Sequence, residues 1–354
     1  MTAHVNRIGT AVPPHDVHAA FLDFARTQLT NDKQRSVFDR MADRSGISHR
    51  FSDFRPGEPG AEQVDADGFF NRGRFPSTAA RMRLYEPRAV ELALRAIANL
   101  DIDVTTLTHI VVASCTGFMA PGLDQVLASR LGMADDVQRV AVGFMGCYAA
   151  VPALRVAADA VRADASARVL VINLELCSLH MQETSDLETI LSFVLFGDGC
   201  TAALVTAEPA GIELGAFRSR TLPDSADLIT WRIGDQGFDM RLSGKVPGRI
   251  AAALRAEVEA NDDGGLLRGR GTGFDLWAVH AGGRTVLDAV EQGLRLPAGR
   301  LDTSRAVLRD SGNMSSATIM FILARMMDEP AGSIGLGMAF GPGVCAETFG
   351  FTRV

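Results

Sequence analysis

The sequence lacks the positive charge and the long apolar runs that would mark a nucleic-acid-binding protein or a membrane protein. Its 35 Lys and Arg residues are outnumbered by 42 Asp and Glu residues, which gives a net charge of −7, and an acidic chain disfavours nucleic acid as the main partner. No apolar run reaches the roughly 18 residues that a membrane-spanning helix needs. The first residues also lack the basic stretch and apolar run of a secretory signal. We therefore expect a cytoplasmic protein without a membrane span.

Cysteine is scarce and shows no pairing pattern. The five cysteines, at positions 115, 147, 177, 200 and 345, form no C-x-x-C motif. An odd number of cysteines in a chain without a secretory signal makes a disulfide framework unexpected. The seven histidines show no metal-ligand spacing with the cysteines or with one another, so we expect no metal site. Because most free cysteines are small buried hydrophobes, only their context can single out a reactive one.

Apolar sequence is abundant, and it alternates between two patterns. Of the 354 residues, 47% are hydrophobic, which is ample for a large core. The segment 15–50 carries helical signals, and 51–78 is rich in Gly and Pro and is expected to be irregular. Strands are predicted at 109–116, 137–145, 167–176 and 200–208, and helices at 86–100, 122–132 and 147–164. This alternation is typical of a layered α/β fold whose strands are buried on both faces.

The second half of the chain repeats the same alternation. It predicts a strand at 275–282, a helix at 284–294, a glycine turn leading into a helix near Ser315, and a terminal hairpin over 333–353. The alternation of strand and helix patterns is interrupted between residues 209 and 225. We therefore expect two halves, 1–215 with a nucleophile and 216–354 with further site residues. Internal duplication is suggested, although identity between the halves is too weak to prove it.

Cys147 stands where an apolar strand ends and a helix begins. A thiol at a helix N-terminus meets unpaired N–H groups and the positive end of the helix dipole, which favour the thiolate and lower the pKa. Gly146 removes the side chain that would crowd a sharp turn. Pro152 is expected in the first turn of the helix, where proline is tolerated. A cysteine that merely packs one helix end would show the same local sequence.

Two polar residues further along the chain could complete a site with Cys147. His280 ends a strand and opens into Ala-Gly-Gly, at the edge where α/β folds place ligands, although a core or capping histidine would look similar. Asn313 precedes a long apolar helix, where an Asn is common as an N-cap. Together, Cys, His and Asn suit thioester chemistry, because the thiolate takes the acyl group and the other two donate hydrogen bonds to an oxyanion or enolate. A cysteine hydrolase could use the same trio.

The chain resembles the type III polyketide synthases, the chalcone synthase-like enzymes. Five segments carry this resemblance in the order and spacing of the family: GFMGCYAAVPALRVA, LFGDGCTAAL, WAVHAGG, DSGNMSSATIMFIL and MAFGPGVCAETFGF. The resemblance implies a thiolase-like duplicated α-β-α-β-α fold and a homodimer. It also implies iterative decarboxylative condensation of malonyl-CoA onto an acyl-CoA starter, without a carrier protein, a metal or a redox cofactor.

The resemblance also implies a role for individual residues. Cys147 corresponds to the nucleophile, and His280 and Asn313 to the pair that orients malonyl-CoA and stabilises its enolate; His280 would also keep the cysteine ionised. Phe196 corresponds to a gatekeeper residue between the substrate tunnel and the active-site cavity of the family. Without the resemblance, Phe196 would be interpreted as an ordinary core phenylalanine. The residues implied to bind coenzyme A are Arg40, Arg44 and Ser315, while a third basic position of plant relatives is Val37 here. Without the resemblance, Arg40 and Arg44 could equally be solvated surface arginines.

Departures from the plant pattern indicate a bacterial-type member of the family. Met240 corresponds to a second gatekeeper phenylalanine, Cys115 and Cys177 to cavity threonines, and Trp231 to a small cavity glycine. These changes make the cavity softer and less polar. They favour a fatty acyl or malonyl starter, the fatty acyl slightly, and a pyrone or phenolic product. A single-round condensing enzyme of the ketoacyl synthase III type and a catalytically silent scaffold remain the alternatives.

Overall fold

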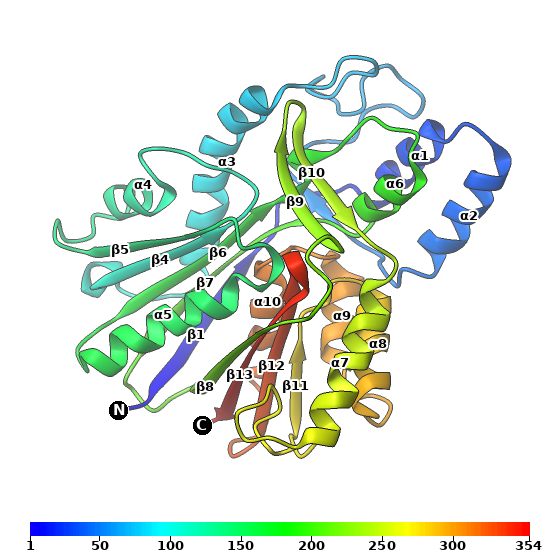
Figure 1. Ribbon diagram of the computed structural model, residues 1–354. Helices are drawn as coiled ribbons and strands as arrows, with labels where there is room; N and C mark the ends of the chain where they lie inside the picture. The colour runs from blue at the N-terminus through cyan, green and yellow to red at the C-terminus, as the bar shows by residue number, and fades with distance from the viewer.

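A mixed sheet of nine strands forms the centre of the molecule (Figure 1). The computed structural model describes all residues, 1–354. The strands of this sheet are β1 (Ala3–Ala11), β4 (His109–Ser114), β5 (Gln138–Gly143), β6 (Val169–Leu176), β7 (Asp198–Thr206), β8 (Ile212–Thr221), β11 (Leu276–Val279), β12 (Ile334–Gly341) and β13 (Cys345–Arg353). Their order across the sheet is β11-β12-β13-β8-β1-β7-β6-β4-β5. Strands of the N-terminal half thus lie on one side of the β1–β8 pair, and strands of the C-terminal half on the other.

Helices cover the sheet and connect its strands. The helices are α1 (His18–Gln28), α2 (Asp32–Asp43), α3 (Thr78–Ala98), α4 (Leu123–Arg130), α5 (Ala150–Ala163), α6 (Leu187–Phe193), α7 (Val246–Ala260), α8 (Arg284–Leu294), α9 (Asp302–Ser311) and α10 (Ala317–Met326). Two small sheets, β2 (His15–Asp16) with β3 (Phe51–Ser52) and β9 (Ile229–Gly234) with β10 (Gly237–Leu242), complete the structure. No helix is both long enough and apolar enough to cross a membrane.

Three hydrophobic cores show that the layers follow the order α-β-α-β-α. The middle core packs α5 and α10 between the two parts of the sheet, an outer core packs α3 and α4 on the N-terminal part, and the third packs α7 and α8 on the C-terminal part. In β4, Val111 and Ala113 face the middle core while Ile110 and Val112 face the outer core. Because successive strand residues point to opposite faces, this strand is apolar throughout. The predicted thiolase-like fold is confirmed.

The halves meet between β7 and β8. The predicted division at residues 215 and 216 falls inside β8, whereas residues 207–211 connect it to β7. The final hairpin of β12 and β13 is antiparallel, as the sequence predicts. Strand β1 was not predicted, and it pairs with both β7 and β8 at the junction.

Two sequence predictions about individual elements are wrong. Helix α3 begins at Thr78 and not near residue 86, where the sequence predicted its start. The Ser77 side chain caps it by accepting a hydrogen bond from the Ala80 amide, and the helix continues through Pro87. Proline usually ends or bends a helix, which is why the sequence placed the start beside it. Strand β5 is not buried on both faces, because it is the last strand of the sheet and only Val142 is buried in it.

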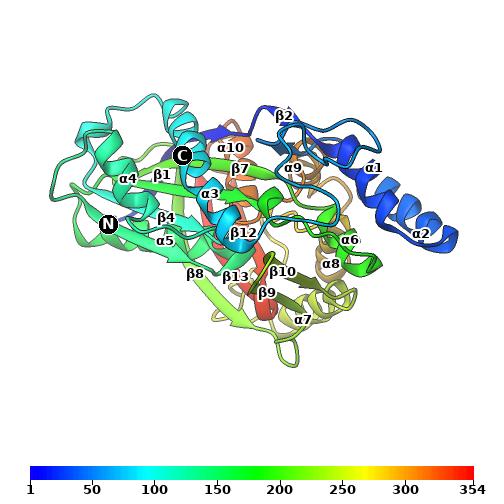
Figure 2. The same cartoon turned by 90° about the horizontal axis from the view of Figure 1, so that it is seen from above.

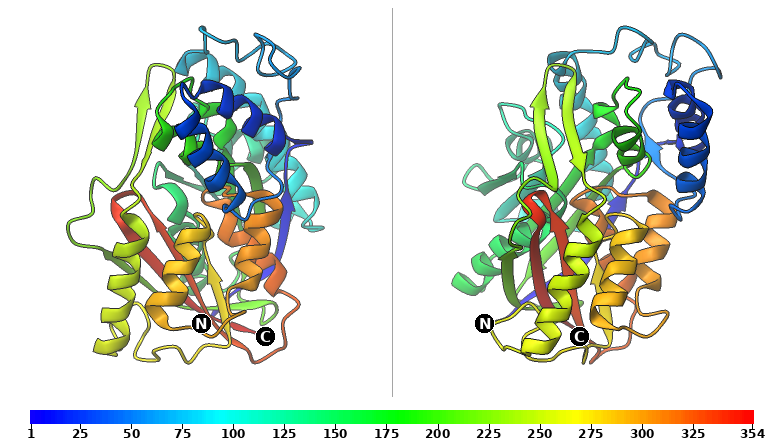
Figure 3. Two further views of the ribbon diagram at one scale, coloured as in Figure 1. Left: turned by 90° about the vertical axis from the view of Figure 1, so that its right-hand side faces the viewer. Right: turned by 45° about the vertical axis from the view of Figure 1, so that its right-hand side comes forward.

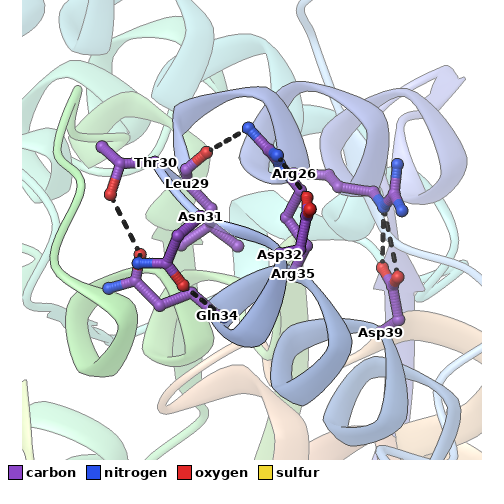
Figure 4. Close-up of polar contacts among 8 residues, drawn as sticks. All are labelled: Arg26, Leu29, Thr30, Asn31, Asp32, Gln34, Arg35 and Asp39. Atoms are coloured by element: carbon purple, nitrogen blue, oxygen red, sulfur yellow. Dashed lines mark hydrogen bonds and ion pairs between the residues drawn. The ribbon is translucent and has the colours of Figure 1, made fainter.

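The peripheral elements gather at one end of the molecule. Helices α1 and α2 project from this end (Figure 2), and the hairpin of β9 and β10 stands above the end of the sheet, close to α6 (Figure 3). Two arginines of α1 and α2 form local ion pairs (Figure 4): Arg26 with Asp39, and Arg35 with Asp32. Arg35 also donates a hydrogen bond to the Leu29 carbonyl at the end of α1. These contacts fix the two helices to each other.

Candidate active site

Cys147 lies in a tight turn between strand β5 and helix α5. Phe144 and Gly146 both have positive φ, at 55° and 76°, so the chain reverses sharply before the cysteine. A Cβ on Gly146 would lie 2.5 Å from Cδ of Pro342, and glycine is therefore required at this position. Cys147 is the central residue of a 3₁₀ turn, and Pro152 is the third residue of α5, which confirms its predicted place in the first helical turn.

Asn313 is held in the turn between α9 and α10 by both its backbone and its side chain. Its N–H donates to the Leu195 carbonyl at 2.8 Å, and its carbonyl accepts from the Gly197 N–H at 3.0 Å. Its Oδ1 accepts from the Ser315 N–H at 2.8 Å, and its Nδ2 donates to the Gly282 carbonyl at 3.2 Å. One Nδ2 hydrogen remains. Burial raises the pKa of the Cys147 thiol, and a hydrogen bond from Asn313 is among the contacts that oppose this rise. Asn313 is not the N-cap of α10, a position that Ser316 occupies.

His280 lies directly after β11, beside the loop that accepts the Asn313 hydrogen bond. Its side chain is buried, and neither ring nitrogen has a hydrogen-bond partner. Burial lowers the pKa of His280 to about 3, so the ring is neutral. A Cβ on Gly282 would lie 3.7 Å from Nε2 of His280. Gly282, whose carbonyl accepts the Asn313 hydrogen bond, thus follows His280 by two residues in the same loop.

A small cavity of about 20 Å³ opens beside Cys147. We call it the inner cavity. Its lining includes the five residues that the sequence assigned to a gate or cavity wall, which are Cys115, Cys177, Phe196, Trp231 and Met240. The other lining residues are Gly146, Cys147 and Ser315, which the sequence also singled out, and Thr116, Phe193, Ile229 and Pro342, which it did not. Ser315 therefore lies among the reacting groups, where its Oγ is 3.3 Å from Sγ of Cys115.

The hairpin of β9 and β10 supplies one wall of the inner cavity. Trp231 and Met240 are directly paired in its ladder, so their side chains share one face of the hairpin. The indole Nε1 of Trp231 donates to the Cys115 carbonyl at 2.7 Å. This bond fixes the position of the largest side chain that lines the inner cavity.

The protonation state of Cys147 differs from the sequence prediction. Burial raises the pKa of the Cys147 thiol to about 11, and hydrogen bonds from Ser315 and Asn313 oppose this shift only in part. The prediction of a lowered thiol pKa is therefore wrong for this structure, because the loss of water around the sulfur outweighs the turn and its hydrogen bonds. The pKa values of about 11 for Cys147 and about 3 for His280 leave both side chains neutral at neutral pH.

A second, larger hollow lies outside the inner cavity, and we call it the outer pocket. Its volume is about 1000 Å³, and Arg44, Leu195, Gly282, Gly283 and Arg284 are among its lining residues. Arg40, the other predicted cation, is exposed one helical turn before Arg44 and does not line this pocket. The outer pocket borders the inner cavity at residues 192–196, because Leu195 lines one and Phe196 lines the other.

The comparisons with known proteins agree with this geometry. The family model described as chalcone and stilbene synthases, N-terminal domain, matches residues 2–209, and that of the C-terminal domain matches residues 213–354. The chain belongs to this family, the type III polyketide synthases. It is therefore an acyltransferase-type enzyme that makes polyketides.

Individual relatives of this type III polyketide synthase come from bacteria and plants. The alpha-pyrone synthesis polyketide synthase-like Pks18 of Mycobacterium tuberculosis is 35% identical, over 77% of this chain and 73% of that protein. The 1,3,6,8-tetrahydroxynaphthalene synthase of Streptomyces griseus is 31% identical, over 96% and 90%. The crystal structure of the corresponding synthase from Streptomyces coelicolor superimposes with a TM-score of 0.84 at 28% identity and covers both chains completely.

Two buried charged residues support the site of this type III polyketide synthase and were missed by sequence reasoning. The first is Arg50, whose Nη1 donates to the carbonyls of Phe193 at 2.8 Å and Phe196 at 3.0 Å. Its Nε donates to Nδ1 of His18 at 2.9 Å. Burial lowers the pKa of Arg50 to about 9, which still leaves it charged at neutral pH. Arg50 therefore fixes the segment that separates the two cavities, and no feature of the local sequence marks it.

The second is Glu175, which is buried at the end of β6 behind the wall of the inner cavity. Its carboxylate accepts hydrogen bonds from the Cys115 N–H at 3.0 Å and the Thr116 hydroxyl at 2.9 Å, and also from the Ser316 hydroxyl. Burial raises its pKa. A single acidic residue within the apolar stretch VLVINLEL was the signal that could have found it, since buried acids are rare unless they are hydrogen-bonded. His, Cys, Asp and Glu side chains nowhere gather in a group of three that could hold a metal ion.

Proposed function

We propose that this enzyme transfers a short acyl group from coenzyme A to Cys147, extends it with malonyl-CoA and releases the product as a small pyrone. The observation that carries the proposal is the inner cavity of about 20 Å³. Such a space holds about one water molecule. Any acyl group beside Cys147 would therefore require the walls to move, and a long acyl chain would require the largest displacement. Of the two starters expected from the sequence, the geometry therefore favours malonyl or a similarly small group over a fatty acyl chain.

Loading of the starter begins with a neutral thiol and a neutral imidazole. His280 accepts the proton of Cys147 while the sulfur attacks the thioester carbonyl of the starter, because pKa values of about 11 for Cys147 and about 3 for His280 disfavour a free thiolate–imidazolium pair before the attack. The bond to the coenzyme A sulfur breaks, and the departing thiolate takes the proton from His280. Transfer of the proton to an adjacent base is the usual way to activate a thiol whose own pKa is high.

Extension uses the hydrogen-bond donors around the acylated sulfur. The free Nδ2 hydrogen of Asn313 and the N–H of His280 hold the thioester carbonyl of malonyl-CoA. When carbon dioxide leaves, the electron pair of the broken C–C bond forms an enolate, which these fixed donors stabilise in a site with little water. The enolate carbon attacks the acyl-cysteine, which releases the Cys147 thiolate and leaves a chain two carbons longer on coenzyme A.

The length of the product follows from the space available. One relative is named for alpha-pyrone synthesis and another for 1,3,6,8-tetrahydroxynaphthalene, and these two products require chains of different lengths. A pyrone ring closes after few extensions, whereas a naphthalene needs more. Trp231 lines the inner cavity and is fixed by its bond to the Cys115 carbonyl. We therefore favour the pyrone.

The test is to incubate the purified enzyme with malonyl-CoA alone, and then with acetyl-CoA, hexanoyl-CoA or palmitoyl-CoA as starter, and to identify the products by mass. We expect pyrones from malonyl-CoA alone or with acetyl-CoA, and none with the Cys147→Ala variant. Product formed only with palmitoyl-CoA would overturn the proposed starter. A single extension per product would instead identify a ketoacyl synthase III-type enzyme, and product from Cys147→Ala would overturn the mechanism.

We also propose that the enzyme is a homodimer that buries strand β5. This strand is one of the two edge strands of the sheet, and Val140 on it and Phe118 near it are exposed large hydrophobic residues. An exposed apolar edge strand usually has a partner. Sedimentation of the enzyme should give twice the monomer mass, and Val140→Lys should shift it toward the monomer. A monomeric parent enzyme would contradict the proposal.

A further inference from the structure

The outer pocket has a cation from each half of the chain at its rim. Arg44 ends helix α2 in the N-terminal half, and Arg284 begins helix α8 in the C-terminal half. Nη1 of Arg284 donates to the Arg44 carbonyl at 3.4 Å, and a Cβ on Gly46 would lie 4.0 Å from Cδ of Arg284. The two side chains therefore come from adjacent backbone, although 240 residues separate them in sequence.

Most of the hydrogen-bonding capacity of Arg284 remains free. Its side chain is half exposed, and its only carboxylate neighbour is Asp288, at 3.7 Å from Nε. Asp288 has a closer partner in Arg305, whose Nη2 lies 2.8 Å from the other carboxylate oxygen. The Arg44 side chain forms no hydrogen bond or ion pair, in contrast to Arg26 and Arg35 of the same helix pair (Figure 4). Two guanidinium groups are thus available at one rim.

The surroundings of Arg284 add to its positive potential. The first turn of α8 has no acidic residue, and no side chain caps its N-terminus, so the partial positive charge of the helix end is not neutralised. Glu188 is the one carboxylate of the pocket lining without an ion-pair partner. The other acid of the lining, Asp288, is bonded to Arg305. The rim therefore favours an anion on the side of Arg44 and Arg284.

We propose that Arg284 acts with Arg44 to bind the phosphate groups of coenzyme A, so that the second cation of this site comes from the C-terminal half of the chain. Arg40 lies outside the pocket lining, and Val37 carries no charge, so α2 alone supplies only Arg44 to the pocket. Guanidinium groups bind phosphates through paired, charge-assisted hydrogen bonds. The inference rests on the proposed function, because it assumes that the acyl donor is a coenzyme A thioester.

The variant Arg284→Gln tests the proposal, with Arg255→Gln as the matched control. Arg255 is exposed on α7 and does not line the pocket. Calorimetric titration with coenzyme A should show about tenfold weaker binding for Arg284→Gln at low salt, and a smaller difference at high salt, because exposed ion pairs are screened. The control should bind like the parent enzyme. Glu188→Gln, which removes the opposing charge, should bind coenzyme A about twice as tightly.

Kinetic measurements with two malonyl donors distinguish the loss of a contact between Arg284 and the coenzyme A phosphates from a general loss of catalytic activity. For Arg284→Gln, the KM for malonyl-CoA should rise by about the same tenfold factor, whereas the KM for malonyl-pantetheine, which lacks the nucleotide and its diphosphate, should not change. Unchanged coenzyme A binding, or equal losses with both donors, would overturn the inference. Because the titration needs no turnover, it tests Arg284 even if the enzyme makes no polyketide and the proposed function fails.

Discussion

The inner cavity and the outer pocket of this enzyme differ in volume and in the charge of their linings, although residues 192–196 contribute to the lining of both. The inner cavity has a volume of about 20 Å³ and is lined mainly by apolar and sulfur-containing side chains. The outer pocket has a volume of about 1000 Å³ and is lined by charged residues as well as apolar ones. A dry, rigid site strengthens the hydrogen bonds that stabilise an enolate, whereas a wide, charged site can bind a large polar carrier. Substitutions in the inner cavity should therefore change kcat or the product, and substitutions in the outer pocket should change KM.

The largest effect is expected from Asn313→Ala in the inner cavity. Loss of one preorganised donor to an enolate or oxyanion lowers kcat by about 10²–10³-fold. The rate of malonyl-CoA decarboxylation, measured as the release of carbon dioxide, should fall by this factor, while the affinity for coenzyme A should not change. Because Asn313 also bonds Gly282, the melting temperature of the variant must be measured alongside. Normal decarboxylation in a folded variant would remove Asn313 from the mechanism.

The raised pKa of Cys147, about 11, predicts a strong pH dependence for its alkylation. Only the thiolate reacts, so the rate with iodoacetamide should rise about tenfold per pH unit, or about 100-fold from pH 7 to pH 9. Mass mapping of the labelled peptide separates Cys147 from the buried Cys115 and Cys177. A rate that is already constant from pH 6 upward would show instead that Cys147 and His280 form an ion pair before substrate binds.

Trp231→Ala should enlarge the inner cavity and lengthen the product. A change of one cavity side chain alters discrimination between substrates by about 1–3 kcal/mol, which corresponds to a change of about 10- to 200-fold in the ratio of longer to shorter polyketides. Ile233→Ala is the control, because this residue is exposed on the same strand and does not line the cavity. Identical product profiles for Trp231→Ala and the parent enzyme would show that the cavity volume does not set product length.

The smallest effect is expected from Arg44→Gln in the outer pocket. Arg44 is exposed, so its contribution to phosphate binding is screened by solvent and salt, and we expect the KM for malonyl-CoA to rise only about fivefold. The value of kcat should not change, because a contact made equally in the ground state and the transition state lowers KM alone. A loss of kcat with unchanged KM would place Arg44 with the chemistry and would break the contrast between the two hollows.

The sequence predicts those parts of the site that depend on local geometry. Gly146 and Pro152 indicate a sharp turn into a helix, and the structure confirms that turn around Cys147. The fold class follows equally from the alternation of apolar strands and helices. These signals are readable because each involves residues close together in the chain.

What the sequence does not predict depends on distant contacts or on solvent. The pKa of Cys147 is raised by burial under segments far along the chain, and no local pattern reports that burial. The exposure of β5 depends on its position at the edge of the sheet, which its apolar residues do not reveal. Arg50 looks like a surface arginine until the fold brings it to Phe193 and Phe196.

Residues 192–196, which Arg50 holds through hydrogen bonds to two of their carbonyls, form a shared wall between the inner cavity and the outer pocket. Leu195 lines the outer pocket and Phe196 lines the inner cavity. A displacement of this backbone therefore enlarges one of the two spaces and reduces the other. Affinity for the carrier and capacity for the product are consequently not independent traits. An evolutionary or engineered change that makes room for a longer polyketide by moving residues 192–196 will also alter how the donor docks, whereas a change at Trp231, which lies in β9, can alter the product alone.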